Sequence, residues 1–142
     1  MMQLPAKIKD IIPHKPPMLV VDELLKCSGE GALVRAKPGP DCPFSRGVSL
    51  DRLAGIEMIA QAYAAYRAWH ALLEGKTLKT GFLVGVQRSS LRDIPCQGPL
   101  YVRVYTVGEF EEFAVAEGEI SPEDGENLCR ARLKLWSPLE ET

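Results

Sequence analysis

The sequence predicts an α+β fold in which one long helix packs against a sheet of antiparallel strands. Residues 49–73 form the one long segment with helical periodicity, two shorter strand-like segments precede it, and four segments with period-two alternation follow it. Short turns separate neighbouring strands, and such turns are typical of antiparallel pairing. The helix needs a wide apolar surface to lie against, and the sheet provides one.

The first two strands are expected to form a hairpin before a long loop. Met18–Cys27 is largely apolar and is followed by the turn Ser28–Gly31, and a second strand is predicted over Ala32–Lys37. Residues 38–48 contain three prolines and two glycines, so they are predicted to form a loop.

The helix is expected to begin near Ser49 and to end at Leu73. Ser49 is a suitable N-cap, Asp51 suits the first turn, and Gly75 marks the stop. Four strands are then predicted, with turns at Ile94–Pro99 and Pro122–Asn127 between them: Gly81–Leu91, Leu100–Phe110, Phe113–Ile120 and Leu128–Trp136. In the last strand three cationic residues alternate with Cys129, Ala131, Leu133 and Leu135, which predicts one buried face.

Length and composition indicate one globular domain, spanning residues 1–142. Hydrophobic residues make up 46% of the chain and charged residues 25%, which is ordinary for a domain with an apolar core. The net charge of −2 argues against a general nucleic-acid binder. No apolar run reaches the roughly 18 residues that a membrane span needs.

The chain is also expected to lie in the cytoplasm, without a metal or a redox cofactor. Lys7, Lys9 and Asp10 lie where a signal peptide would have its apolar core. The four cysteines form no C-x-x-C motif and have no nearby pair of histidines, so neither a disulfide framework nor a zinc site is predicted.

Glu57 and Gln61 lie on the apolar side of the predicted helix. At about 100° per residue, one sector holds the charged positions and is expected to face solvent: Arg52, Arg67, His70 and Glu74. Glu57 and Gln61 point away from this sector, and their neighbours are mostly alanine and leucine: Leu50, Leu53, Ala54, Ala60, Ala64, Ala65, Ala68, Ala71 and Leu72. The alanines would let the helix approach the sheet closely.

A carboxylate in this position has two interpretations. Burying it without partners costs on the order of several kcal/mol, or raises its pKa until it takes up a proton. In the structural interpretation, Glu57 reaches a rim or pairs with a buried arginine. In the functional interpretation it is an acid or base with a tuned pKa, and Gln61, one turn further on, orients it. The helical pattern alone leaves both open.

Several motifs resemble those of the bacterial β-hydroxyacyl-acyl carrier protein dehydratases. Residues 12–22 (IPHKPPMLVVD) are similar to that family's L-P-H-R-x-P-x-L-L-V-D opening, and Pro43-Phe44 to its P-F-F loop. Residues 56–62 (IEMIAQA) resemble its helix signature E-x-x-A-Q-A, and residues 81–86 (GFLVGV) its F-L-x-G-I strand. Gly98-Pro99-Leu100 resembles its P-G-D-x-L turn.

The resemblance implies a hotdog fold, in which an antiparallel sheet wraps a long central helix, and a dimer with substrate tunnels between subunits. In that family a histidine removes the C2 proton of the β-hydroxyacyl thioester, and a helix carboxylate of the other subunit protonates the leaving hydroxyl. Backbone N–H groups near the helix start hold the thioester carbonyl, which suits a helix N-terminus. Glu57 takes the position of the carboxylate. The residues expected to contact substrate are Gln61, Phe44, Gly55 and Phe82.

The chain departs from the family at the catalytic histidine. The family has G-H-F-P-G before the helix, whereas residues 45–52 here (SRGVSLDR) contain no histidine. Of the two histidines in the chain, His70 falls in the solvent sector, and His14 matches the opening motif, where it is a candidate for a relocated base. This pattern is most similar to divergent dehydratases associated with aryl-polyene or polyketide-like clusters.

The predicted function is therefore a dehydratase-like lyase that removes water from a 3-hydroxyacyl thioester, in fatty-acid or polyketide-like biosynthesis. The expected carrier is an acyl carrier protein or coenzyme A. The chain is expected to form a homodimer or higher oligomer, or to pair with another hotdog protein that supplies the missing histidine. Two alternatives remain, a hotdog thioesterase and a non-catalytic acyl-binding subunit. Scattered cationic residues are a candidate rim for an acidic carrier: Arg46, Arg52, Lys76, Lys79, Arg88 and Arg92.

Overall fold

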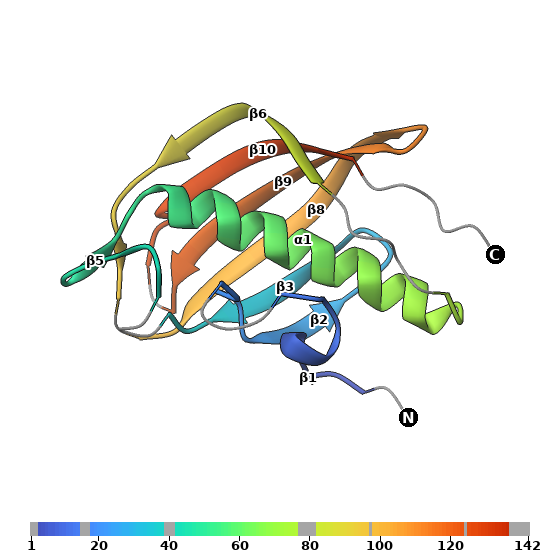
Figure 1. The fold of residues 1–142 in the computed structure, drawn as a ribbon, viewed down its shortest axis with the longest axis horizontal. Helices are drawn as coiled ribbons and strands as arrows, with labels where there is room; N and C mark the ends of the chain where they lie inside the picture. Colours follow the sequence, from blue (N-terminus) through green and yellow to red (C-terminus); the bar gives the residue numbers. More distant parts are fainter. Residues whose placement is uncertain are drawn as a thin grey trace.

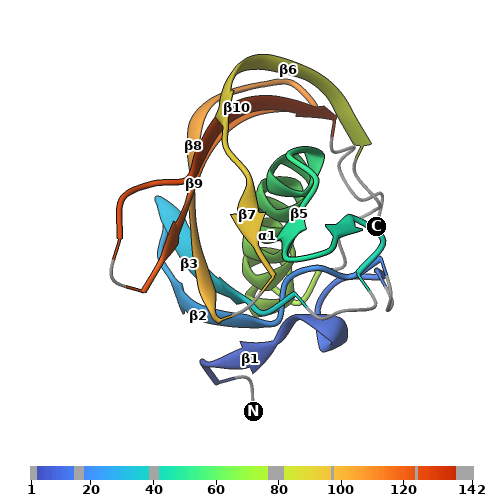
Figure 2. The same ribbon diagram turned by 90° about the vertical axis from the view of Figure 1, so that its left-hand side faces the viewer.

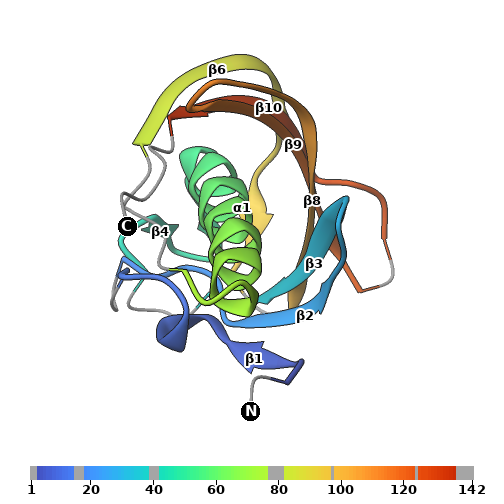
Figure 3. The same ribbon diagram turned by 90° about the vertical axis from the view of Figure 1, so that its right-hand side faces the viewer.

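One helix lies in the hollow of a curved antiparallel sheet. The computed structural model describes residues 3–14, 18–38, 42–76, 82–96, 98–123 and 125–136. Helix α1 (Leu53–Leu73) crosses the concave face of the sheet (Figure 1), and the sheet curls around it when seen along the helix (Figures 2 and 3). The predicted α+β arrangement is confirmed.

The main sheet has seven strands in the order β1-β2-β3-β8-β9-β10-β6, and every neighbouring pair is antiparallel. Its strands are β1 (Ala6–Lys7), β2 (Glu23–Cys27), β3 (Gly31–Ala36), β6 (Phe82–Leu91), β8 (Leu100–Phe110), β9 (Phe113–Pro122) and β10 (Cys129–Trp136). A small second sheet near the start of the helix contains β4 (Ser45–Arg46), β5 (Ser49–Leu50) and β7 (Ile94–Pro95). A short 3-10 helix, η1 (Ile8–Asp10), follows β1.

The strand predicted over Met18–Cys27 is shorter in the structure, where it corresponds to β2. Residues 18–22 do not belong to β2, which begins at Glu23. The reason lies in their hydrogen bonds: the Val20 N–H donates to the Gln61 side chain at 2.9 Å, and the Met18 carbonyl accepts from the same side chain at 2.8 Å. A side chain of the helix thus occupies backbone groups that a neighbouring strand would otherwise bind.

The helix begins at Leu53, so the prediction of Ser49 as its N-cap is wrong. Ser49 and Leu50 form β5, which pairs with both β4 and β7. The capping interaction comes instead from Asp51, whose Oδ1 accepts a 2.9 Å hydrogen bond from the Leu53 N–H. The predicted stop is confirmed: Gly75 adopts φ 73°, a left-handed conformation that favours glycine just after a helix.

The buried face of the helix is rotated relative to the prediction. Ala54, Ala65 and Ala68 are buried against the sheet, as expected. Leu53, however, is 59% exposed and Leu72 is also exposed, because the sheet curls around the opposite side of the helix. Glu57 therefore lies at the border between the covered and uncovered sides. In β10, Cys129, Ala131, Leu133 and Leu135 are buried, as the alternation predicts.

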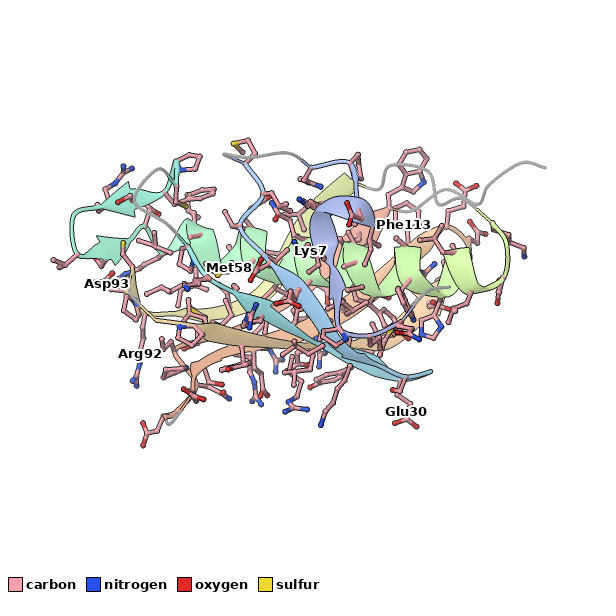
Figure 4. All side chains as sticks on the ribbon, turned by 90° about the horizontal axis from the view of Figure 1, so that it is seen from below. Lys7, Glu30, Met58, Arg92, Asp93 and Phe113 are labelled. Atoms are coloured by element: carbon pink, nitrogen blue, oxygen red, sulfur yellow. The ribbon has the colours of Figure 1, made fainter. Side chains whose placement is uncertain are left out.

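Membrane-spanning helices and metal-binding clusters are both absent from the described residues. Among the described residues, no helix combines the length and apolarity that a bilayer crossing requires. Within those same residues, no three His, Cys, Asp or Glu side chains gather in a way that could hold a metal ion. Side chains cover both faces of the sheet (Figure 4).

Candidate active site

Gln61 organises the site, although it is an amide on the buried face of the helix. Its side chain is only 1% exposed. The Nε2 group donates to the Met18 carbonyl at 2.8 Å and to Glu57 Oε1 at 2.7 Å, while Oε1 accepts from the Val20 N–H at 2.9 Å. Both amide protons and the amide oxygen are thus used, which removes the cost of burying this group.

Glu57 lies one helical turn before Gln61 and is half-buried. Its side chain is 29% exposed, and in the part of the chain that the structure describes it forms no ion pair with an arginine. Its Oε1 is held by Gln61, so the second carboxyl oxygen remains for proton transfer.

His14 brings a second titratable group to the same place. It lies in the segment that leads from η1 towards Met18, and its Nε2 is 4.0 Å from Glu57 Oε1. The side chain is 35% exposed, and its Nδ1 is buried without a hydrogen-bond partner among the described residues. Nε2 is therefore the nitrogen that faces the carboxylate.

This arrangement suits general acid–base chemistry. A separation of 4.0 Å is longer than a hydrogen bond, so the imidazole and the carboxylate lie close together without being hydrogen-bonded to each other. Distances in free enzymes are often longer than those in complexes with substrate. An imidazole and a carboxyl group side by side can remove one proton and deliver another.

Of the other predicted contact residues, Phe44 and Gly55 lie near the start of the helix. Phe44 is half-buried before β4, and its carbonyl accepts a 2.7 Å hydrogen bond from the Asp51 N–H. Gly55 is buried in the first turn, where an added Cβ would lie 3.1 Å from Cys129 Sγ, and its N–H donates to the Arg52 carbonyl. Phe82 begins β6, and its side chain lies outside the described residues. Substrate contact by these three stays a prediction.

His70 was predicted to face solvent, and the structure contradicts this prediction. It is half-buried because the β2–β3 turn folds over the helix, and its Nε2 lies 2.5 Å from the Ser28 carbonyl and 3.6 Å from Cys27 Sγ. A carbonyl only accepts hydrogen bonds, so Nε2 carries the proton and cannot deprotonate the thiol. Burial raises the pKa of Cys27 to about 11, which also opposes a nucleophilic role.

The sequence offered partial signals for this site. Glu57, Gln61 and His14 were each singled out, but the contacts of Gln61 with the Met18 and Val20 backbone were missed. A buried glutamine has two N–H donors and one carbonyl oxygen that need hydrogen-bond partners. This requirement could have predicted that a backbone segment lies against Gln61.

Comparison with known proteins identifies the family. The model of the ApeP-like family, described as ApeP dehydratase, matches residues 6–142. The chain belongs to the ApeP-like dehydratase family. The predicted resemblance to dehydratases is confirmed, and family membership makes the chain a dehydratase-like protein, a lyase by reaction class. No curated protein matches the sequence.

Solved structures with the same fold confirm the hotdog architecture. The dehydratase heterocomplex ApeI:P from Xenorhabdus doucetiae matches with a TM-score of 0.85 and 23% identity over 95% of this chain and 93% of that chain. A thioesterase from Pseudomonas aeruginosa matches with a TM-score of 0.66 and 13% identity, over 96% of each chain. A hypothetical thioesterase from Streptococcus pneumoniae matches with a TM-score of 0.64 and 14% identity, over 83% of this chain and 90% of that chain.

Proposed function

We propose that this chain dehydrates β-hydroxyacyl thioesters, with His14 and Glu57 as the acid–base pair and Gln61 as the residue that positions Glu57. The observation that supports this most directly is the convergence of His14 Nε2 and Glu57 Oε1 to 4.0 Å, with Gln61 bound to the same carboxylate. The reaction belongs to fatty-acid or polyketide-like biosynthesis in the cytoplasm, on acyl chains carried by an acyl carrier protein or coenzyme A.

His14 and Glu57 together account for both proton transfers of the proposed reaction. His14 Nε2 removes a proton from C2, and the electron pair of that C–H bond forms the C2=C3 double bond. The C3–O bond breaks as protonated Glu57 transfers its proton to the leaving hydroxyl, which departs as water. The imidazolium then returns a proton to the nearby carboxylate, which restores the starting state without a metal or redox cofactor.

The proposed assembly is a pair with a second hotdog chain. Among the described residues β6 pairs only with β10, so its other edge lacks a strand partner. Leu83, Val84 and Val86 on this strand are exposed, and so is Leu53 on the uncovered side of the helix. Unpaired edges and grouped apolar side chains favour association. The match to a dehydratase heterocomplex supports a partner of the same fold, and a homodimer is the other form that this surface suits.

The test follows the products of a medium-length β-hydroxyacyl-pantetheine thioester by mass. Wild-type protein is expected to convert it to the product that lacks one water. Glu57→Gln and His14→Ala are each expected to slow this reaction by about 10²–10⁴-fold, the range of a general acid or base. Glu126→Gln, at an exposed turn residue, is the matched control and should retain full activity.

Each other result has a defined meaning. Release of free thiol in place of water would establish a thioesterase. Intact substrate with the wild type would exclude a self-sufficient dehydratase, and binding without turnover would indicate an acyl-binding subunit. Full activity in His14→Ala would remove His14 from the mechanism and leave the base to the partner chain.

A further inference from the structure

A cavity apart from the His14–Glu57 pair is lined by three lysines. Lys7 from β1, Lys9 from η1 and Lys37 after β3 line a pocket of about 280 Å³, whose remaining wall is the segment Leu19–Asp22. Figure 4 shows the β1–η1 region, with Lys7 labelled, lying across the helix. The three lysines come from parts of the sequence up to 30 residues apart, so only the fold brings them together.

Within the part of the chain that the structure describes, these lysines have no carboxylate partner. The carboxylate in the pocket wall, Asp22, is bound instead by Arg35 at 2.9 Å, and Arg35 also pairs with Glu23. Three like charges around one cavity repel one another, and a bound anion would relieve that repulsion. By contrast, Arg46, Arg52 and Lys76 of the predicted basic rim are each paired with a carboxylate.

The pocket shares a wall with the candidate active site. Val20 lines the pocket, and its N–H is the donor to Gln61, whose side chain in turn holds Glu57. A ligand bound in this pocket would contact Val20, and Val20 is linked to Glu57 through Gln61. The volume of about 280 Å³ leaves room for one phosphate group.

We propose that this pocket binds a phosphate group, namely the phosphate of the 4′-phosphopantetheine arm on which the acyl thioester is carried. Lysine is a common phosphate ligand that acts as a point charge. The assignment of the arm rests on the proposed dehydration of carried thioesters, whereas the preference for phosphate rests on the three lysines alone.

The decisive experiment compares binding of 4′-phosphopantetheine with binding of pantetheine, which lacks the phosphate. Isothermal titration of the full chain is expected to show tighter binding of the phosphorylated compound. The triple variant Lys7→Gln, Lys9→Gln, Lys37→Gln should weaken that binding by about tenfold, the combined effect of three exposed charges, without changing pantetheine binding. Raising the salt concentration should reduce the difference between the two ligands. Lys26→Gln, an exposed lysine of β2 outside the pocket, is the matched control.

Three results would overturn the proposal: equal binding of both compounds by the wild type, an equal loss for both in the triple variant, or an equal loss in Lys26→Gln. Coenzyme A and holo acyl carrier protein both contain the arm, so both should lose affinity in the triple variant. A loss confined to coenzyme A would assign the pocket to a nucleotide phosphate and overturn the assignment to the arm. Because these readouts need no turnover, a failure of the proposed dehydration does not affect them.

Discussion

At the scale of single residues, Gln61 links the helix to the segment that carries His14. It is the one polar residue in the core among the described residues, and its three hydrogen bonds join Glu57, Met18 and Val20. Such a fully satisfied buried amide specifies one arrangement of the chain, since any other leaves polar groups unpaired. The candidate catalytic pair therefore depends on a residue that need not touch substrate.

Replacing Gln61 with methionine should lower stability and activity together. The substitution keeps the length of the side chain but leaves the buried Val20 N–H without its acceptor, at about 1–3 kcal/mol. Urea denaturation measures the free energy of unfolding. Gln87→Met, at an exposed position of β6, serves as the control. An unchanged free energy of unfolding would contradict the structural role of Gln61.

The Cys27 thiol gives a pH dependence whose sign follows from its burial. Burial raises its pKa from 9.0 to about 11, so the folded protein holds this proton more tightly than the unfolded chain does. The resulting stabilisation is complete below pH 9 and is lost as the pH rises towards 11. Cys27→Ser should therefore show a smaller fall in unfolding free energy across this interval than the wild type. Parallel slopes in urea denaturation series would contradict the prediction.

At the scale of elements, the helix approaches the sheet closely because small residues line the contact. Alanines cover the helix side, and Gly118 of β9 lies opposite Ile59, where an added Cβ would be only 2.5 Å from Ile59 Cγ2. Close packing of this kind holds the helix at a fixed depth. That depth in turn places Glu57 at the border of the covered side.

Gly118→Ala should destabilise the protein by about 1–3 kcal/mol, the usual cost of overpacking a core. The matched control is Gly108→Ala, because an added Cβ there meets nothing within 4 Å. Shortening the opposing side chain with Ile59→Val should recover part of the loss in the double variant. Thermal unfolding of the wild type, the two single variants Gly118→Ala and Ile59→Val, and the double variant measures this coupling. Equal effects of Gly118→Ala and Gly108→Ala would contradict it.

At the scale of the whole molecule, strand β6 forms an edge of the sheet that has no second strand partner among the described residues. Strand β6 has apolar residues exposed along its length, and Val84 is 51% exposed. We expect Val84→Lys to shift the assembly towards single chains, because a charge on an edge strand opposes strand pairing. Light scattering after size exclusion measures the mass. Val107→Lys, at another exposed valine, on β8, is the control, and an unchanged mass for Val84→Lys would contradict pairing through β6.

Much of the fold could be predicted from local patterns. Strand β8 begins and ends where the alternation predicts, and β9 and β10 agree within two residues. The sequence does not predict the short strands β1, β4, β5 and β7, because two-residue strands have no periodicity. The apolar run of residues 18–22 predicts strand, because nothing in that run shows that a glutamine side chain binds the backbone of Met18 and Val20.

The sequence by itself determined the order of the elements, the long helix and the unusual placement of Glu57 beside Gln61, because periodicity and composition are local properties. Only the tertiary structure decided that His14 meets Glu57, 43 residues away, and that Lys7, Lys9 and Lys37 share one pocket. The physical reason is the curl of the sheet around the helix, which sets both which side of the helix is covered and which distant segments cross it. No local pattern contains that curvature.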